Sequence, residues 1–122
     1  MTKDKKSPSI IYINKLRDSF KNMEKKFKVY KLTYGDYYYI GRTNNIKRRL
    51  NEHNSSYKKG KNKIFYNLLR QDNVEDLKAS VEVEIIGEYN TLADSKRFEL
   101  YTILDYHFKG KNLYQKIPNI YR

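Results

Sequence analysis

The segment from Phe27 to Arg42 is the feature that most constrains the fold of this chain. Phe27–Tyr34 alternates apolar or aromatic side chains with polar ones, which is the pattern of a half-buried β-strand. Gly35-Asp36 supplies the residues of a tight turn, and Tyr37–Arg42 is a second aromatic-rich segment of strand length. The two segments predict an antiparallel β-hairpin.

Helical patterns flank this hairpin. The expected helices span Ile10–Lys26, Ile46–His53, Ile64–Arg70 and Thr91 to about Phe108. The longest helix is capped by Thr91 and is expected to point Leu100, Ile103, Leu104 and Phe108 inward.

The remaining segments are a strand and two irregular stretches. Ala79–Ile86 alternates apolar and acidic residues, which predicts a third strand that stops at Gly87. Asn54–Lys63 is expected to be a basic loop, and Lys111–Arg122 an irregular tail.

The order of these elements predicts an α+β fold. A three-stranded antiparallel sheet flanked by helices, with an extra N-terminal helix, is the economical way to bury the apolar stripes. We expect residues 1–26 to form an N-terminal tail and helix, and residues 27–122 to form one domain.

The formal net charge of +12 over 122 residues is the strongest compositional signal. A compact chain this basic repels itself and gains from a polyanionic partner, of which phosphate backbones are the commonest. Lysine, asparagine, tyrosine and isoleucine are all abundant, so a gene rich in A and T is the alternative explanation of the charge. The chain has no cysteine, which excludes disulfides, thiolate metal sites and cysteine nucleophiles.

A set of spaced residues runs through the predicted elements. The hairpin carries Val29-Tyr30 on its first strand and Tyr39-Ile40-Gly41 on its second. The next helix follows the pattern Thr43-x-Asn45-Ile46-x-x-Arg49-Leu50-x-x-His53, and Glu99 and Asn112 come much later.

This set resembles the GIY-YIG nuclease superfamily from Phe27 to roughly Pro118. The second motif is intact, whereas the first departs from the family because Lys28-Val29-Tyr30 stands where its name calls for Gly-Ile-Tyr. The resemblance implies a phosphodiester hydrolase that uses Mg²⁺ or Mn²⁺ and leaves a 5′-phosphate and a 3′-hydroxyl. The site residues that it implies are Tyr30 as the base, Tyr39 and His53 as hydrogen-bonding partners, Arg49 as the transition-state clamp, Glu99 as the metal ligand, and Asn112.

Elementary chemistry is consistent with these roles. Arg49 and His53 are four residues apart and share one helix face, and a guanidinium can hold two phosphoryl oxygens as charge builds in a transition state. A tyrosine is a poor base unless nearby cations favour its phenolate. One carboxylate can hold a hard divalent cation if water and substrate phosphate fill the other positions.

Each of these residues also has a purely structural interpretation. The two tyrosines fit as strand aromatics, Arg49 and His53 as part of a solvated basic face, Glu99 as a surface charge, and Asn112 as a helix C-cap beside Gly110.

We therefore expect a metal-dependent endonuclease that acts on double-stranded DNA by one-metal, in-line attack of water. The alternatives are a non-catalytic nucleic-acid-binding module on the same fold, or a basic scaffold protein. A homodimer or a specificity-supplying protein partner is compatible with the sequence. With no apolar stretch of membrane-spanning length, we expect an intracellular protein without a membrane partner. The residues expected to bind nucleic acid are Arg42, Lys47, Arg48, Lys58, Lys59, Lys61 and Lys63.

Overall fold

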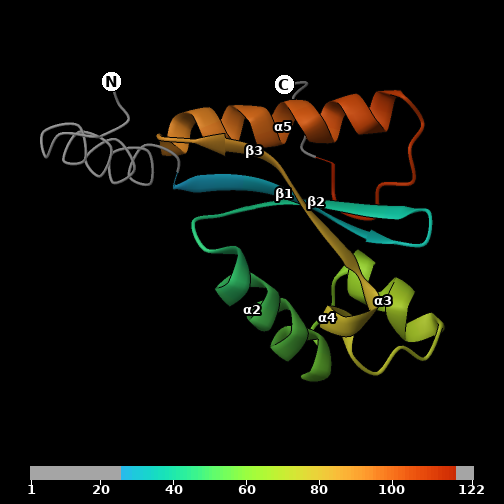
Figure 1. Ribbon diagram of the computed structural model, residues 1–122. Coiled ribbons are helices and arrows are strands. Elements are labelled where there is room, and N and C mark those ends of the chain that lie inside the picture. The colour runs from blue at the N-terminus through green and yellow to red at the C-terminus, as the bar shows by residue number, and fades with distance from the viewer. Residues whose placement is uncertain (1–25, 118–122) are drawn as a thin grey trace, which may run out of the picture.

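A three-stranded antiparallel sheet lies at the centre of the fold, with helices on both of its faces (Figure 1). The structure is a computed structural model, and it describes residues 26–117. The strands are β1 (Phe27–Tyr34), β2 (Tyr37–Thr43) and β3 (Glu82–Tyr89), in the order β2-β1-β3. This confirms the predicted α+β architecture. The predicted N-terminal helix lies outside the described residues, apart from Lys26, which has no regular secondary structure.

The hairpin forms as the alternation predicts. Tyr34 pairs with Tyr37 at the turn, and Tyr30 pairs with Gly41 toward the other end. The register between β1 and β3 shifts between Val29 and Tyr30, which indicates a β-bulge. Because side chains alternate along β1, Tyr30 and Leu32 lie in one core and Val29 in the other.

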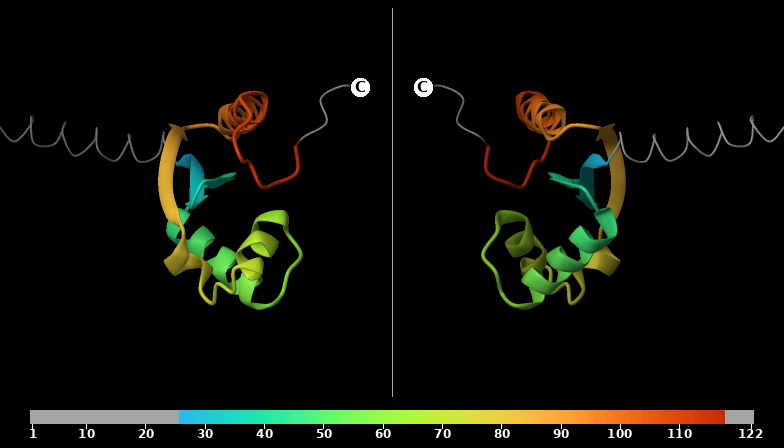
Figure 2. Two further views of the ribbon diagram at one scale, coloured as in Figure 1. Left: turned by 90° about the vertical axis from the view of Figure 1, so that its right-hand side faces the viewer. Right: turned by 90° about the vertical axis from the view of Figure 1, so that its left-hand side faces the viewer.

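Three helices cover one face of the sheet: α2 (Ile46–Lys58), α3 (Ile64–Gln71) and the short α4 (Leu77–Ser80). Figure 2 shows them together on one side of the strands. The buried core on this side is mainly aromatic and leucine-rich, and consists of Tyr30, Leu32, Tyr57, Phe65, Tyr66, Leu68, Leu69 and Leu77.

Helix α5 (Leu92–Phe108) covers the opposite face (Figures 1 and 2). Val29, Ile40 and Ile103 are the buried centre of this second core, and Phe98 packs against it. The expectation for Phe108 is wrong, because its side chain is 65% exposed at the end of α5. None of the described helices is long and apolar enough to cross a membrane.

Helix α2 extends beyond the predicted end at His53, into the segment expected to be a loop. Its last turn is held by Tyr57, which is 5% exposed and donates its hydroxyl to the carbonyl of Val74 at 2.5 Å. The short helix α4, which was not predicted, is capped by Asp76, whose carboxylate accepts from the backbone N–H of Ala79. The longer α2 depends on a contact between segments that are distant in sequence. Helix α4 is too short to show a helical periodicity of apolar residues.

Strand β3 begins and ends three residues later than the predicted strand. Gly87 lies inside it, paired with Val29, and does not terminate it. A Cβ atom at this position would lie 2.8 Å from the ring of Tyr89 and 3.0 Å from the ring of Phe98. The glycine therefore leaves room for these two rings beside the sheet and does not mark a turn.

The segment after α5 returns along the edge of β2. Tyr38 donates its backbone N–H to the carbonyl of Asn112 at 2.8 Å, and its own carbonyl accepts from Tyr114 at 2.8 Å. The side-chain amide of Gln115 bonds both backbone groups of Ile40, at 2.6 and 2.9 Å. This segment is thus fixed to the edge strand.

Candidate functional site

Four of the predicted site residues lie together between the sheet and α2. Tyr30 comes from β1 and Tyr39 from β2, and both belong to the core that α2 helps to cover. Arg49 and His53 come from successive turns of α2. His53 is 0% exposed, whereas the Arg49 side chain keeps 29% of its surface exposed.

The start of α2 sets the direction in which these two side chains point. Asn45 is the N-cap, and its side chain accepts from the backbone N–H of Arg48 at 3.0 Å. The hydroxyl of Thr43 accepts from the backbone N–H of Asn45 at 3.1 Å. The threonine and asparagine of the sequence pattern therefore fix where the helix begins, which turns Arg49 and His53 toward the sheet.

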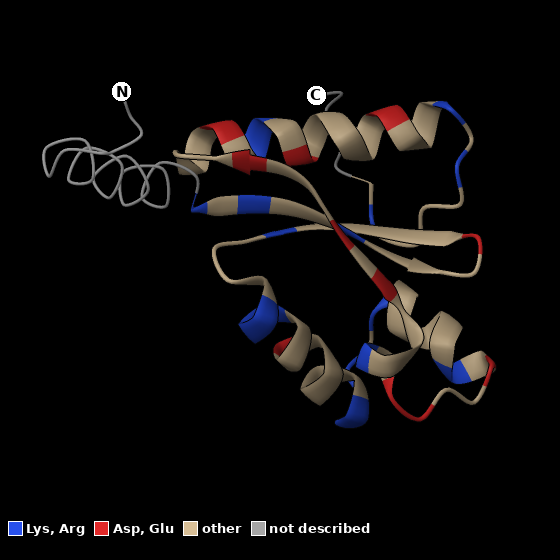
Figure 3. Ribbon diagram, viewed as in Figure 1, with Lys and Arg blue, Asp and Glu red and all other residues tan. Residues whose placement is uncertain are grey.

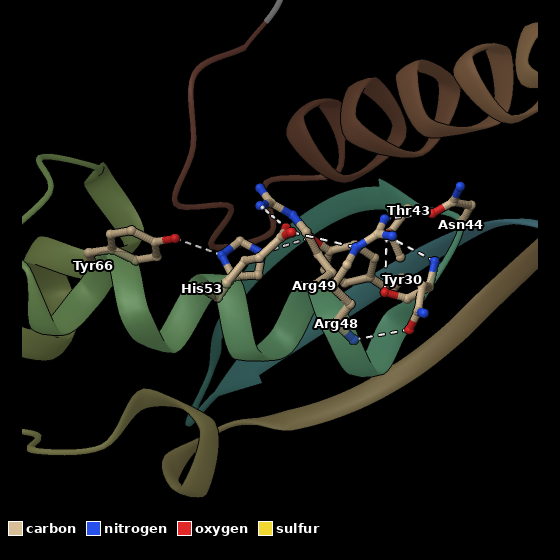
Figure 4. A network of polar contacts seen from close by, with 9 residues as sticks. Tyr30, Thr43, Asn44, Arg48, Arg49, His53 and Tyr66 are labelled. Carbon is tan, nitrogen blue, oxygen red and sulfur yellow. Dashed lines mark hydrogen bonds and ion pairs between the residues drawn. The ribbon is translucent and has the colours of Figure 1, made fainter.

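A buried chain of hydrogen bonds joins three aromatic side chains (Figure 4). The hydroxyl of Tyr30 lies 2.7 Å from Nε2 of His53, and Nδ1 of His53 lies 2.7 Å from the hydroxyl of Tyr66. Tyr30 is 0% exposed and Tyr66 is 1% exposed. Tyr66 was not a predicted site residue, and nothing in the sequence distinguishes it from the other tyrosines.

Burial keeps the imidazole of this chain neutral. It lowers the pKa of His53 to about 3, with smaller contributions from the cations of Arg49 and Lys63. A neutral imidazole has one donor and one acceptor nitrogen. One of the two tyrosines therefore donates to His53 and the other accepts from it.

Gly41 explains how the Tyr30 side chain reaches His53. A Cβ atom on residue 41 would lie 2.4 Å from both Cζ and the hydroxyl oxygen of Tyr30, far inside any contact distance. The phenol therefore crosses directly over the glycine. This is the physical reason for a glycine in the Tyr39-Ile40-Gly41 motif.

Arg49 lies beside both hairpin tyrosines. Burial acts to lower the pKa of Arg49, but the hydroxyls of Tyr30 and Tyr39 and the carboxylate of Glu52 outweigh it and raise the pKa. Arg49 stays charged, and Nη1 donates to Glu52 at 3.2 Å.

The two tyrosines differ in access to solvent. Tyr30 is sealed, and its pKa is raised chiefly by burial, against the opposing effect of Arg49. Tyr39 is half-buried and lines a cleft of about 530 Å³. Burial raises the pKa of Tyr39, Arg49 lowers it, and the carboxylate of Glu99 raises it further. Of the two tyrosines, Tyr39 is therefore the one that an incoming ligand meets.

Glu99 approaches this group from α5. Its Oε1 accepts from Nε of Arg42 at 3.3 Å, and a quarter of its side-chain surface is exposed. It lies close enough to Tyr39 for its charge to act on that phenol. Because β2 is an edge strand, side chains from the helices on both faces come together around it.

The donor set at Glu99 suits only one kind of metal site. Within residues 26–117, no three His, Cys, Asp or Glu side chains gather closely enough to hold an ion together. Arg42 occupies Oε1 of Glu99, and no hydrogen bond joins Oε2 to another described residue. A single carboxylate oxygen fits a hydrated Mg²⁺ or Mn²⁺ that takes its remaining ligands from water and phosphate.

Asn112 lies at the edge of this group through its backbone. Its carbonyl accepts from the backbone N–H of Tyr38, the residue before Tyr39 on β2. Its side chain is exposed.

The predicted nucleic-acid-binding residues lie mostly at the two ends of α2 (Figure 3). Lys47 and Arg48 are exposed in its first turn, and Arg42 is half-buried at the end of β2. The other four are all exposed and are called the α2–α3 lysines below: Lys58, Lys59, Lys61 and Lys63.

The sequence profile of the GIY-YIG catalytic domain matches residues 28–113 of the chain, which confirms the resemblance drawn from the motifs. The matched range contains every predicted catalytic residue. Comparisons with curated proteins and with solved structures gave no significant match.

Proposed function

Since this chain belongs to the GIY-YIG catalytic domain family, whose members are generally endonucleases, we propose that it is a metal-dependent endonuclease acting on double-stranded DNA. The proposed reaction is hydrolysis of a phosphodiester bond by in-line attack of water, with one metal ion. The observation that carries the proposal is the position of Tyr39, which lines an open cleft and lies close enough to Arg49 and Glu99 for both charges to act on its hydroxyl.

Arg49 is the proposed phosphate clamp. Its guanidinium stays charged, is held by Glu52 on one side, and keeps part of its surface open. A guanidinium in this position can donate two hydrogen bonds to phosphoryl oxygens and stabilise the charge that builds on them.

Tyr39 is the proposed acceptor of the water proton. The sequence favoured Tyr30 for this step, but the Tyr30 hydroxyl is sealed between Gly41 and His53. Tyr39 lines the cleft. Burial raises its pKa, and the neighbouring Arg49 opposes that effect by favouring the phenolate. Tyr30 then acts as a positioning residue beside the clamp, together with His53.

Glu99 is the proposed metal ligand, through the oxygen that Arg42 leaves open. A bound dication there would act as a Lewis acid on the phosphate and offset the negative charge that raises the pKa of Tyr39. Arg42 holds the carboxylate in place from β2.

Nicking of supercoiled plasmid tests the enzyme proposal. We expect nicking with Mg²⁺ that a chelator abolishes, and that Arg49→Ala and Glu99→Gln also abolish while DNA binding is largely kept. The matched controls are Arg97→Ala and Glu88→Gln, two exposed residues outside the site. Binding without nicking under every metal condition would overturn the proposal and favour a non-catalytic binding module.

Paired single-atom variants test the tyrosine assignment. Tyr39→Phe removes the proposed acceptor and should abolish nicking. Tyr30→Phe removes a buried hydrogen bond and should lower both nicking and stability, with residual activity. Full activity of Tyr39→Phe together with complete loss in Tyr30→Phe would return the base to Tyr30.

A further inference from the structure

The cleft beside Tyr39 has the size and the walls of a small-ligand site. Its volume of about 530 Å³ falls within the range of about 300–1,000 Å³ that is usual for such sites. It lies between the start of α3 and the segment after α5, and the residues on its two sides include Phe65 and Tyr114. A duplex is far too wide for this space, whereas one nucleotide fits it.

Aromatic side chains line the cleft. Tyr39 contacts Phe65 with ring centroids 5.6 Å apart, and Tyr114 contacts Tyr37 at 4.8 Å, so the rings are held in place. Phe65 is nearly buried and forms the floor, whereas Tyr39 and Tyr114 are only half-buried. Every nucleobase can stack on such faces, whatever its identity.

Two lysines give the walls of the cleft a positive charge. Lys63 lies over the ring of Tyr39 at 5.9 Å, and burial together with the neighbouring charge of Arg49 lowers its pKa. Among residues 26–117, no carboxylate lies within ion-pair distance of Lys63 or of Lys116 on the opposite wall. A phosphate would relieve the repulsion between Lys63 and Arg49, so the chemistry suits a nucleotide better than a free base.

Two uncharged polar side chains of the cleft already make hydrogen bonds within the protein. Both ends of the Gln115 amide bond the backbone of Ile40, and the amide oxygen of Asn62 accepts from Asn67 at 2.8 Å. Recognition of one particular base requires a fixed pattern of donors and acceptors at its edge. The cleft therefore selects for an accessible base rather than for its identity.

We propose that this cleft binds one unpaired nucleotide next to the scissile phosphate, so that the protein prefers DNA with an unstacked nucleotide at the cut. The phosphate lies on Lys63 and Arg49, and the base lies against Tyr39 and Tyr114. The inference rests on the proposed function for the position of the cut, but the binding itself does not require catalysis.

Two synthetic duplexes of one sequence test it, one fully paired and one with a single extrahelical 2-aminopurine nucleotide. Binding is measured with the full chain in the presence of chelator, so that cleavage is prevented. We expect the second duplex to bind roughly tenfold more tightly, which corresponds to about 1.4 kcal/mol, because its free base can stack on the aromatic rings of the cleft. The 2-aminopurine fluorescence should change on binding.

Tyr114→Ala should remove this preference without weakening binding of the paired duplex. Tyr101→Ala is the matched control, because Tyr101 is 64% exposed on α5, outside the cleft. Equal binding of both duplexes by the unchanged protein, or a preference that Tyr114→Ala leaves intact, would overturn the inference.

A second pair of variants covers the case in which Tyr114→Ala does not fold. Ile64 lines the cleft, is 48% exposed and is the first residue of α3. Ile64→Glu therefore brings a negative charge to the cleft and leaves no cavity in the core. It should remove the preference, whereas Leu92→Glu, at the equivalent exposed first position of α5, should keep it. If the protein nicks plasmid but shows no preference for the extrahelical nucleotide, this inference alone is wrong. If it shows the preference but nicks no substrate, only the proposed function is wrong.

Discussion

Replacing Gly41 by alanine should damage the site through a single methyl group. The new Cβ atom would lie 2.4 Å from the Tyr30 hydroxyl and Cζ, and ordinary contact begins at about 3.4 Å. The phenol therefore has to move by about 1 Å. A displacement of that size is enough to break the 2.7 Å hydrogen bond to His53, since no hydrogen bond remains near 3.6 Å.

The cost can be worked from these contacts. Overpacking of a closed core costs about 1–3 kcal/mol, and leaving a buried polar group of His53 without its partner costs about 1–3 kcal/mol. The reduced freedom of the unfolded chain returns about 0.4–1 kcal/mol. We expect a net loss of about 1–5.5 kcal/mol in the free energy of unfolding. For a domain of this size that corresponds to a fall in Tm of roughly 4 °C or more.

Urea denaturation followed by far-UV circular dichroism measures this loss, since the chain has no tryptophan to serve as a fluorescence probe. The control is the same glycine substitution in a Tyr30→Leu background, where no ring lies over residue 41. The cost of Gly41→Ala should then fall to less than half, which a double-mutant cycle reports as coupling. A loss below about 1 kcal/mol in the unchanged background, or no coupling to residue 30, would refute the reasoning.

Three further predictions follow from the site. The pKa of His53 is about 3 in the folded chain and about 6.5 in the unfolded chain, so below pH 6.5 the unfolded chain binds one more proton. The free energy of unfolding should therefore fall by about 1.4 kcal/mol per pH unit as the pH drops below 6.5. His53→Gln should reduce this pH dependence, which urea titrations at pH 7.0 and 5.5 measure. Tyr66→Phe leaves a buried His53 nitrogen without a partner and should lower the free energy of unfolding by about 1–3 kcal/mol in urea denaturation. Tyr34→Phe removes an exposed hydrogen bond to Asp72 and should lower it by less than about 1 kcal/mol. Equal losses would contradict the buried hydrogen-bond chain through His53. Changing all four α2–α3 lysines to glutamine should reduce the slope of log affinity for DNA against log salt by about 0.9 for each lysine that contacts a phosphate, and an unchanged slope would show that these lysines do not touch DNA.

The parts of the fold that follow from local rules could be predicted from the sequence. The alternation of Phe27–Tyr34 and the glycine-containing turn after it predict the hairpin. The capping residues Thr43 and Asn45 predict the start of α2. Gly87 was misread because its role depends on the rings of Tyr89 and Phe98, and the second of these comes from another element. A glycine that ends a strand and one that allows a helix to pack closely have the same local sequence signal.

The candidate site also has a part that could be predicted from the sequence and a part that could not. Arg49, His53 and the two hairpin tyrosines lie on elements whose position follows from the motif, so their grouping could be predicted. Tyr66 could not be, because its importance comes only from the contact with His53 across the core. The difference in burial between Tyr30 and Tyr39 was also invisible in the sequence, since both are strand tyrosines that point to the same face.

The segment after α5 also covers part of the β2 edge of the sheet. An open sheet edge presents unpaired amide and carbonyl groups on which another chain can add a strand. Along β2, the groups of Tyr38 are taken by backbone and those of Ile40 by the Gln115 amide. Along β3, Glu82, Glu84 and Glu88 are exposed, so pairing with a second β3 edge would bring like charges together. The two edges of this three-stranded sheet thus hinder the addition of a further strand by different means, one by hydrogen bonds already made and the other by charge.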